Sequence, residues 1–195
     1  MSIIKVETKN REAKVLKINL PLTKEEVLKL KAGDVLELWG EMYTARDAAH
    51  KRFVETLKKS GALPIDLKDA TIFYAGPCPP KPGEVTGPIG PTTSIRMDPY
   101  VEPLIKEGMI AMIGKGERQD YIRDLCKNHK VVYLLGIGGA ATVYAEKIKS
   151  LEEVAYEDLG TESVKRLEVE GLKVIVGIDT EGNVLHKAGR EKFKR

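Results

Sequence analysis

Hydroxyl and cationic side chains gather in the run 90–98, Gly-Pro-Thr-Thr-Ser-Ile-Arg-Met-Asp, and again at Lys115. Three adjacent hydroxyls at 92–94 precede Arg96 on a segment stiffened by glycine and proline. Lys115 follows the apolar run 109–113 and stands between two glycines, which let a backbone approach a ligand closely. Guanidinium and ammonium groups bind carboxylates and phosphates. These residue types predict an anion site.

The same run has a plainer interpretation as a turn, in which Thr92, Thr93 and Ser94 bond to nearby backbone groups. A binding role is favoured because the run lies directly before a predicted helix. Asp98 as N-cap and Pro99 at the first helical position are typical of a helix start. Since the N-terminus of a helix attracts negative charge, the hydroxyls and the guanidinium meet where an anion is stabilised.

A second pair of candidate residues, Arg46 and His50, lies near the start of a helix predicted from 44 to about 60. Residues four apart share one edge of a helix, so both side chains could face the same site. An ordinary pair on the helix surface has the same spacing. The pair alone does not decide between these two interpretations.

Strands and helices alternate along most of the chain. Periodicity, caps and breaks predict strands at 13–18, 35–40, 71–75, 109–113, 131–135, 153–156 and 172–178, and helices at 23–31, 44–60, 98–108, 117–128 and 140–148. This alternation predicts an α/β fold. A length of 195 residues with 42% apolar residues suits one core, and we expect a single domain over 1–195.

Charge and hydropathy argue against several classes of partner. The 32 basic and 29 acidic residues are interspersed and leave a net charge of +3, so no basic stripe that would follow a nucleic acid backbone is visible. The longest apolar runs are far shorter than the ~20 residues of a membrane-spanning helix. We expect a soluble, cytoplasmic protein that binds neither nucleic acid nor membrane.

The two cysteines, Cys78 and Cys126, are widely separated and lack the C-x-x-C spacing of a zinc site. Two thiolates are also too few to hold an iron–sulfur cluster alone. We interpret both as reduced thiols, and we expect this chain to bind no metal or cofactor by itself.

A glycine-rich turn at 136–141, Gly-Ile-Gly-Gly-Ala-Ala, fits the G-x-G-x-x-A pattern of dinucleotide-binding proteins. It lies between a predicted strand and a predicted helix, and Glu157 and Asp158 follow at a suitable distance. Too few residues remain after the turn, however, for a second nucleotide-binding half or a substrate domain. A nucleotide-binding oxidoreductase fragment is therefore an alternative function, and close packing of helix and strand is the simpler role for these glycines.

Taken together, these segments resemble the β subunit of two-subunit class I fumarate hydratases, which corresponds to the C-terminal domain of the single-chain forms. The chain is also similar to the β subunit of L(+)-tartrate dehydratase. The motifs that carry the resemblance span nearly the whole chain: Gly33-Asp34-Val35, Ala45 to His50, Tyr74-Ala75-Gly76-Pro77, Gly90 to Asp98, Gly114-Lys115-Gly116, Gly138-Gly139-Ala140 and Val176-x-x-Asp179. Several ordered motifs are far more specific than any one of them.

The resemblance implies a swivelling β/β/α domain and an enzyme that is active only in a complex. A partner α subunit would carry a 4Fe–4S cluster, and two α and two β subunits would form a heterotetramer. The implied reaction is the reversible addition of water to fumarate, which gives (S)-malate. The small number of cysteines in this chain agrees with such a division of labour.

The site residues of the family transfer to this chain position by position. The positions that match its substrate-binding residues are Arg46, Thr92, Thr93, Arg96 and Lys115. Thr92 also matches the position suggested for proton abstraction, and His50 matches a histidine proposed as catalytic. A threonine hydroxyl is a poor base unless cations and a carboxylate lower its pKa, and Asp47, Asp98 or the partner could supply that carboxylate.

One position departs from the fumarase pattern. Class I fumarases usually have glycine where this chain has Ile95, whereas tartrate dehydratases tend to have a larger apolar residue there. The chain keeps Asp98, which is the fumarase-like residue. Fumarate is the predicted substrate, with tartrate or a methylated fumarate such as mesaconate as the alternatives.

Overall fold

One mixed sheet organises the chain, which we describe from a computed structural model. The residues described are 3–5, 14–59, 61–187 and 189. Their strands form an 8-stranded sheet in the order β1-β2-β3-β4-β5-β6-β8-β7. The strands are β1 (Ile3–Lys5), β2 (Lys14–Asn19), β3 (Val35–Thr44), β4 (Thr71–Phe73), β5 (Ala111–Gly114), β6 (Val132–Gly136), β7 (Ile148–Ala155) and β8 (Val164–Ile178).

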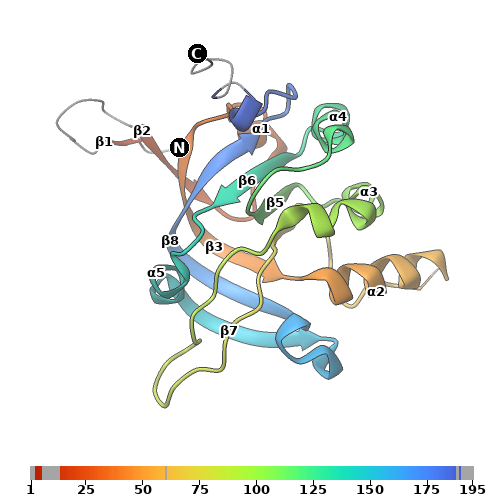
Figure 1. The fold of residues 1–195 in the computed structure, drawn as a ribbon, viewed down its shortest axis with the longest axis vertical. Coiled ribbons are helices and arrows are strands. Elements are labelled where there is room, and N and C mark those ends of the chain that lie inside the picture. The colour runs from red at the N-terminus through yellow and green to blue at the C-terminus, as the bar shows by residue number, and fades with distance from the viewer. Residues whose placement is uncertain (1–2, 6–13, 60, 188, 190–195) are drawn as a thin grey trace.

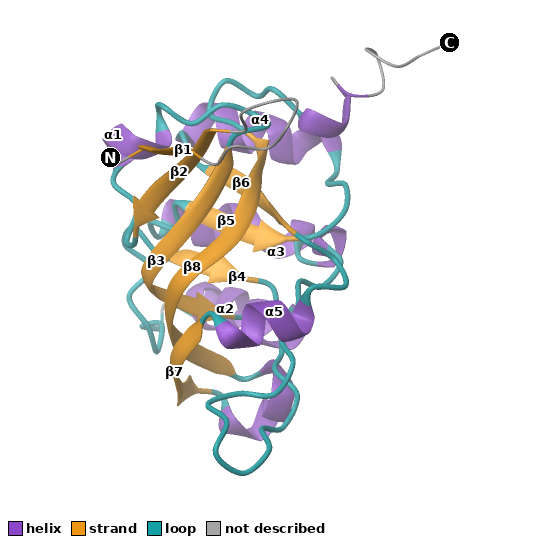
Figure 2. Cartoon of the chain, turned by 90° about the vertical axis from the view of Figure 1, so that its left-hand side faces the viewer, coloured by secondary structure: helices purple, strands orange, loops and turns teal. Residues whose placement is uncertain are grey.

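The sheet closes into a ring because β3 and β8 also pair with each other. β3 is parallel to β2 and β4 and antiparallel to β8. The parallel series from β3 through β4 and β5 to β6 returns through β8, which is antiparallel to β6. The two long strands β3 and β8 run side by side through the molecule, with β7 at the outer side of β8 (Figures 1 and 2).

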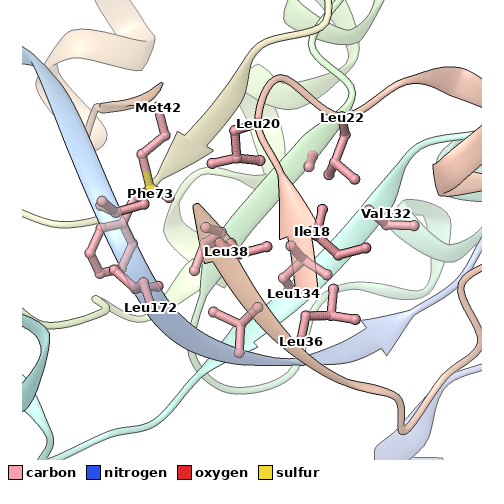
Figure 3. Packing of buried hydrophobic residues seen from close by; sticks show 14 of the residues in the cluster. Ile18, Leu20, Leu22, Leu36, Leu38, Met42, Phe73, Val132, Leu134 and Leu172 are labelled. Carbon is pink, nitrogen blue, oxygen red and sulfur yellow. The ribbon is translucent and has the colours of Figure 1, made fainter. Parts of the chain in front are cut away.

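A cluster of aliphatic and aromatic side chains holds the strands together (Figure 3). Ile18 of β2, Leu36 and Leu38 of β3, Leu134 of β6 and Leu172 of β8 are fully buried in it. A fully buried leucine or isoleucine side chain contributes roughly 1.5–3 kcal/mol relative to an exposed one. The loops that follow the strands are therefore mounted on a well-packed frame.

Three helices pack against β4, β5 and β6 (Figure 1). They are α2 (Asp47–Lys58), α3 (Asp98–Lys106) and α4 (Asp120–His129). The second hydrophobic cluster, which includes Phe53, Ile72, Leu104, Met112 and Ile122, joins them to the strands. Both α2 and α3 begin at residues that the sequence analysis assigned to the candidate site.

The remaining helical elements are short. They are α1 (Lys24–Val27), α5 (Ala141–Glu146) and two 3₁₀ turns, η1 (Ser94–Arg96) and η2 (Glu157–Glu162). In the part of the chain that the structure describes, none of the helices has the length and apolar character needed to cross a membrane.

The predicted α/β class is confirmed, with differences at the ends of elements. The helix predicted from residue 44 begins only at Asp47, because β3 continues to Thr44. Asp98 is the first residue of α3 and not its N-cap. The strand predicted at 172–178 is the second half of β8, whose first half alternates apolar with charged residues. The predicted ends at residues 13 and 60 lie outside the described residues.

Candidate active site

Arg46 stands at the N-cap of α2, and a carboxylate from another part of the chain holds its guanidinium. Arg46 Nη2 lies 3.1 Å from Glu162 Oε1. The other oxygen of Glu162 accepts a hydrogen bond of 3.1 Å from the backbone N–H of Ala48. Gly76 permits this packing, because a Cβ atom there would lie 2.6 Å from the Thr161 carbonyl oxygen and 3.2 Å from Arg46 Cδ. The Arg46 side chain is thereby oriented at the start of the helix.

Asp47 connects Arg46 to the loop that carries the hydroxyls. Its Oδ2 lies 4.0 Å from Arg46 Nε, and its Oδ1 lies 3.3 Å from Arg96 Nε. Arg96 also donates a short hydrogen bond from Nη2 to the hydroxyl oxygen of Thr92. The side chains of Asp47 and Arg96 are 31% and 45% exposed, so solvent reaches this group of charges.

Lys115 lies beside Thr92 because two loops pair through their backbones. The Lys115 N–H donates to the Thr92 carbonyl oxygen at 3.1 Å, and the Ser94 N–H donates to the Lys115 carbonyl oxygen at 3.0 Å. Thr93 and Lys115 form a parallel bridge. Gly116 turns the chain away with a φ of +80°, a conformation that favours glycine. Lys115 is exposed, and its ammonium has no ion-pair partner among the described residues.

Three residues with cationic side chains and two with hydroxyl side chains are therefore brought into one region from three separate segments of the chain. They are the five predicted substrate-binding residues, Arg46, Thr92, Thr93, Arg96 and Lys115. A guanidinium binds a carboxylate through two parallel N–H groups, and an ammonium binds it as a compact charge. A small anion with two carboxylates suits this arrangement.

His50 lies beneath these residues and not among them. Its side chain is fully buried, and its ring packs edge-on against Tyr74 with 5.1 Å between centroids. Nδ1–H donates to the Arg46 carbonyl oxygen at 3.0 Å, so Nε2 carries the lone pair, and this atom has no hydrogen-bond partner in the described residues. Burial lowers the pKa of His50 to about 4. The ring is neutral near pH 7, and a catalytic role for His50 stays a prediction.

A buried ion pair under the two site loops was not found by the sequence analysis. Arg118 Nε donates to Asp98 Oδ1 at 2.5 Å, and the two side chains are 1% and 0% exposed. Asp98 Oδ2 accepts a hydrogen bond of 2.8 Å from the backbone N–H of Gln119. Both carboxylate oxygens of Asp98 are thus engaged by Arg118 and Gln119. Arg118 follows the Lys115 turn closely in sequence, but no spacing rule connects it to Asp98.

The described residues do not form a metal or cluster site. They contain no group of three or more His, Cys, Asp or Glu side chains that could hold a metal ion. Cys126 is buried, and burial raises the pKa of its thiol to about 12, whereas Cys78 is exposed. Iron–sulfur clusters are held mainly by thiolates. The residues of this chain therefore do not fit a 4Fe–4S cluster.

The glycine-rich turn at 136–141 borders the site. A Cβ atom at Gly138 would lie 3.9 Å from Lys115 Cδ, and one at Gly136 would lie 3.0 Å from Pro91 Cγ. The helix after the turn, α5, leads to β7, whose partner in the described sheet is the antiparallel strand β8. A dinucleotide-binding unit needs a parallel strand beside β6 at this point. Of these glycines, Gly136 instead permits close packing against Pro91.

The fold and the candidate site together define a class of protein, a mixed α/β domain whose loops carry cationic and hydroxyl side chains. A family model described as "Fumarase C-terminus" matches residues 2–189. The chain belongs to this fumarase C-terminal family. The resemblance predicted from the sequence motifs is confirmed.

The relatives of this chain include both long and short proteins. The aerobic class I fumarate hydratase of Escherichia coli strain K12 is 41% identical over 150 residues, which are 76% of this chain and 27% of that enzyme. The mitochondrial fumarate hydratase 1 of Leishmania major is 36% identical over 175 residues, 88% of this chain and 32% of that protein. A Methanocaldococcus jannaschii protein named "Putative L(+)-tartrate dehydratase subunit beta" is 39% identical over 177 residues, 88% of this chain and 91% of that protein. The chain thus spans about a third of the fumarate hydratases that it matches.

Proposed function

We propose that the chain is the β subunit of a two-subunit iron–sulfur hydro-lyase that interconverts fumarate and (S)-malate, with residues 1–195 as a single domain. The observation that carries the proposal is that one set of contacts joins Arg46, Arg96 and Lys115: Asp47 lies between the two arginines, Arg96 donates to the Thr92 hydroxyl, and the Lys115 backbone bonds to the Thr92 backbone. Membership in the fumarase C-terminal family supports the reaction class. The 91% coverage of a relative named as a subunit beta supports a separate chain.

The contribution of this chain is to bind the dianion and to stabilise charge. Each carboxylate of fumarate or malate can pair with at least one of Arg46, Arg96 and Lys115. When the proton on carbon 3 of malate leaves, negative charge builds up on the adjacent carboxylate as an aci-carboxylate. Cations held ready at that place stabilise this state more than the bound substrate, which raises kcat.

Thr92 is the proposed base, and its surroundings support that role in kind. Arg96 donates to the Thr92 hydroxyl oxygen, and a neighbouring cation favours a deprotonated hydroxyl. Asp47 remains the carboxylate of this chain near the pair, since it contacts Arg96 at 3.3 Å. In the assembled enzyme, Thr92→Ala should lower kcat by roughly 100-fold with little change in KM. An equal change in both constants would make Thr92 only a binding group.

The 4Fe–4S cluster is assigned to a partner α subunit, because the cysteines of this chain do not fit it. We expect two α and two β subunits in the complete enzyme. The share of the fumarate hydratase relatives that this chain leaves uncovered, about two thirds, is the part that such a partner would supply.

We place the partner on an apolar face beside the site. Val85, Ile95, Ile137 and Val143 are 48%, 42%, 47% and 54% exposed there. The loop before the site lies against α5, since the Ile89 N–H donates to the Ala141 carbonyl oxygen at 3.1 Å. Exposed apolar patches that are rimmed by polar residues are typical of protein interfaces.

A charge placed on this face tests the partner assignment. Val143→Glu should reduce copurification of the α subunit by about tenfold, since a carboxylate would be buried without a partner. Leu28→Glu is the matched control, because Leu28 is 41% exposed in a different part of the fold. Equal copurification with both variants would move the interface elsewhere.

The strand ring with α2, α3 and α4 is proposed to be the swivelling β/β/α domain of the family. Closure of β3 onto β8 supports movement of the chain as one rigid body. Small-angle scattering of the assembled enzyme should then change when malate is added, and an unchanged profile would argue against swivelling. The cytoplasmic location expected from the sequence stays a prediction.

Ile95 makes the substrate the open part of the proposal, because it is 42% exposed next to Arg96. The alternatives are L(+)-tartrate and mesaconate, and the M. jannaschii relative favours the first of these. The deciding experiment is anaerobic coexpression with the candidate α subunit. Hydration of fumarate and mesaconate and dehydration of L(+)-tartrate are then compared. Fumarate turnover that requires both chains supports the proposal, and a preference for tartrate would replace it.

A further inference from the structure

The Asp98–Arg118 ion pair joins the two loops that carry the site cations. Asp98 begins α3 directly after the turn that holds Arg96, and Arg118 follows the turn that holds Lys115. One carboxylate oxygen of Asp98 accepts from Arg118 Nε at 2.5 Å, and the other accepts from the Gln119 backbone N–H at 2.8 Å. A single buried side chain of one loop is thus bound to both the backbone and a side chain of the other.

Aromatic rings and a sulfur atom fix the other faces of Arg118. Its Cζ lies 4.7 Å from the ring centroid of Tyr133 and 5.6 Å from that of Tyr74, and Nη1 contacts Met112 Sδ at 3.7 Å. Burial alone would lower the pKa of Arg118, but Tyr74 and Asp98 outweigh it and raise the pKa above its ordinary value. The guanidinium therefore stays charged in one position.

Tyr133 adds a neutral connection between the same loops. Its hydroxyl donates to the Gly116 carbonyl oxygen at 3.0 Å, so it accepts from Ser94 Oγ–H at 2.9 Å. Ser94 belongs to the turn η1 with Arg96, and Gly116 follows Lys115. Both hydroxyls of this connection have a partner, and buried polar groups satisfied in this way hold the attached segments in one arrangement.

We propose that Asp98 and Arg118 are positioning residues that hold the backbone of the Arg96 turn at a fixed place beside the backbone of the Lys115 turn, and that they thereby select the length of the dicarboxylate. Two cations at a fixed separation can bind both ends of a four-carbon diacid. A shorter or longer diacid would satisfy only one cation fully. The selected ligand class rests on the proposed function, whereas the coupling of the loops does not.

The test variant is Asp98→Asn combined with Arg118→Gln. Removing only one charge of a buried ion pair is strongly destabilising, because the other charge stays buried without a partner. Replacing both charges by amides avoids this. The matched control is Arg123→Gln combined with Asp124→Asn, an exposed pair on α4 with a separation of 2.9 Å. Tyr133→Phe, which keeps the ring and removes the hydroxyl connection, is a second variant if the first does not fold.

Amide hydrogen exchange on the full chain tests the coupling without any substrate. The backbone N–H groups of Ser94 and Lys115 bond across the two loops. Their exchange should become about tenfold faster in the test variant, because those bonds open more often once the ion pair is gone. The control pair should leave their exchange unchanged. Exchange at wild-type rates in a folded test variant would overturn the proposal.

Kinetics of the assembled enzyme test the selection of length. We expect the KM for fumarate to rise about tenfold, kcat to fall by up to about tenfold at an unshifted pH optimum because the same cations stabilise the aci-carboxylate, and the preference for succinate over glutarate as inhibitors to fall about fivefold. An unchanged KM and preference would overturn the proposal, as would a lower kcat with a shifted pH profile, because Asp98 would then belong to the chemistry. If the wild type binds neither fumarate nor succinate, the proposed function fails while the exchange result still decides whether the loops are coupled.

Discussion

Two carboxylate–arginine pairs hold the turn that carries Arg96, one against the start of α2 and one against the segment after Lys115, and water reaches only the first of them. Asp47 and Arg96 are 3.3 Å apart with side chains 31% and 45% exposed. Asp98 and Arg118 are 2.5 Å apart with side chains 0% and 1% exposed. The first pair stands at the front of the candidate site, and the second lies behind it.

The difference in exposure separates two tasks. An exposed ion pair contributes little to stability, so its arginine can exchange the carboxylate of this chain for that of a ligand at small cost. A buried pair cannot exchange, because either charge left alone in the interior is strongly destabilising. The open pair is therefore suited to binding and the buried pair to holding the loops in place.

The strongest challenge to this comparison is removal of each arginine in turn. Arg118→Met should lower the free energy of unfolding by about 4 kcal/mol, because Asp98 stays buried without its partner. Arg96→Met should lower it by less than about 1 kcal/mol, since that side chain is 45% exposed. Urea unfolding of the full chain measures both. Similar losses for the two variants would remove the distinction.

The open pair could be anticipated from sequence, but the buried pair could not. Arg96 and Lys115 stand in runs of hydroxyls and glycines, and such runs indicate an anion site by composition alone. The contact between Asp98 and Arg118 depends on how α3 and β5 return the chain to one place. Tertiary contacts of this kind leave no local pattern.

The fold, too, could be predicted from sequence only where the pattern is local. Alternating strands and helices give the α/β class, and the start of α1 at Thr23 has a capping box visible in the sequence. Closure of the ring depends on β3 pairing with β8, which lie far apart in the chain. The first half of β8 carries charges such as Arg166 and Glu168 on its exposed side. Because of these charges, its sequence resembles that of a surface loop, and the pattern predicts a strand only over the second half.

His50, which is also buried behind the candidate site, makes the free energy of unfolding depend on pH. Burial lowers its pKa to about 4, from 6.5 when it is exposed. Between these values the unfolded chain binds a proton that the folded chain does not, so stability is lost as the pH falls from 6.5 toward 4, by roughly 3 kcal/mol in all. In His50→Phe, the loss of unfolding free energy between pH 7 and pH 4.5 should shrink by most of that amount. His129→Phe, at an exposed position, should behave as the wild type, and an unaltered pH dependence in His50→Phe would contradict the argument.

Gly114 tests how tightly the residues behind the candidate site, around Ser94 and Tyr74, are packed. A Cβ atom there would overlap Ser94 Oγ and lie 2.9 Å from Tyr74 Cδ2, so Gly114→Ala must displace the side chains of Ser94 and Tyr74. We expect a loss of about 2 kcal/mol in the free energy of unfolding. Gly138→Ala is the control, because its nearest contact would be 3.9 Å away, at Lys115 Cδ. Thermal unfolding of the two variants measures the difference. Equal melting temperatures would show that the residues around Gly114 accommodate a methyl group at little cost.

Arg96→Lys should give the smallest effect, because it keeps the charge of the open pair and removes only the two parallel N–H donors of the guanidinium. A lysine binds a carboxylate as a point charge, so the KM for fumarate in the assembled enzyme should rise about tenfold, or about 1.4 kcal/mol, with unfolding unaffected. Arg166→Lys is a close match in exposure, with its side chain at 44% against 45% for Arg96, and lies in ion pairs with Glu41 and Glu152 away from the site. Arg166→Lys should change neither the KM for fumarate nor the free energy of unfolding. A KM that is equal in both variants would mean that Arg96 does not contact the carboxylate, and the open pair would then be an ordinary surface ion pair.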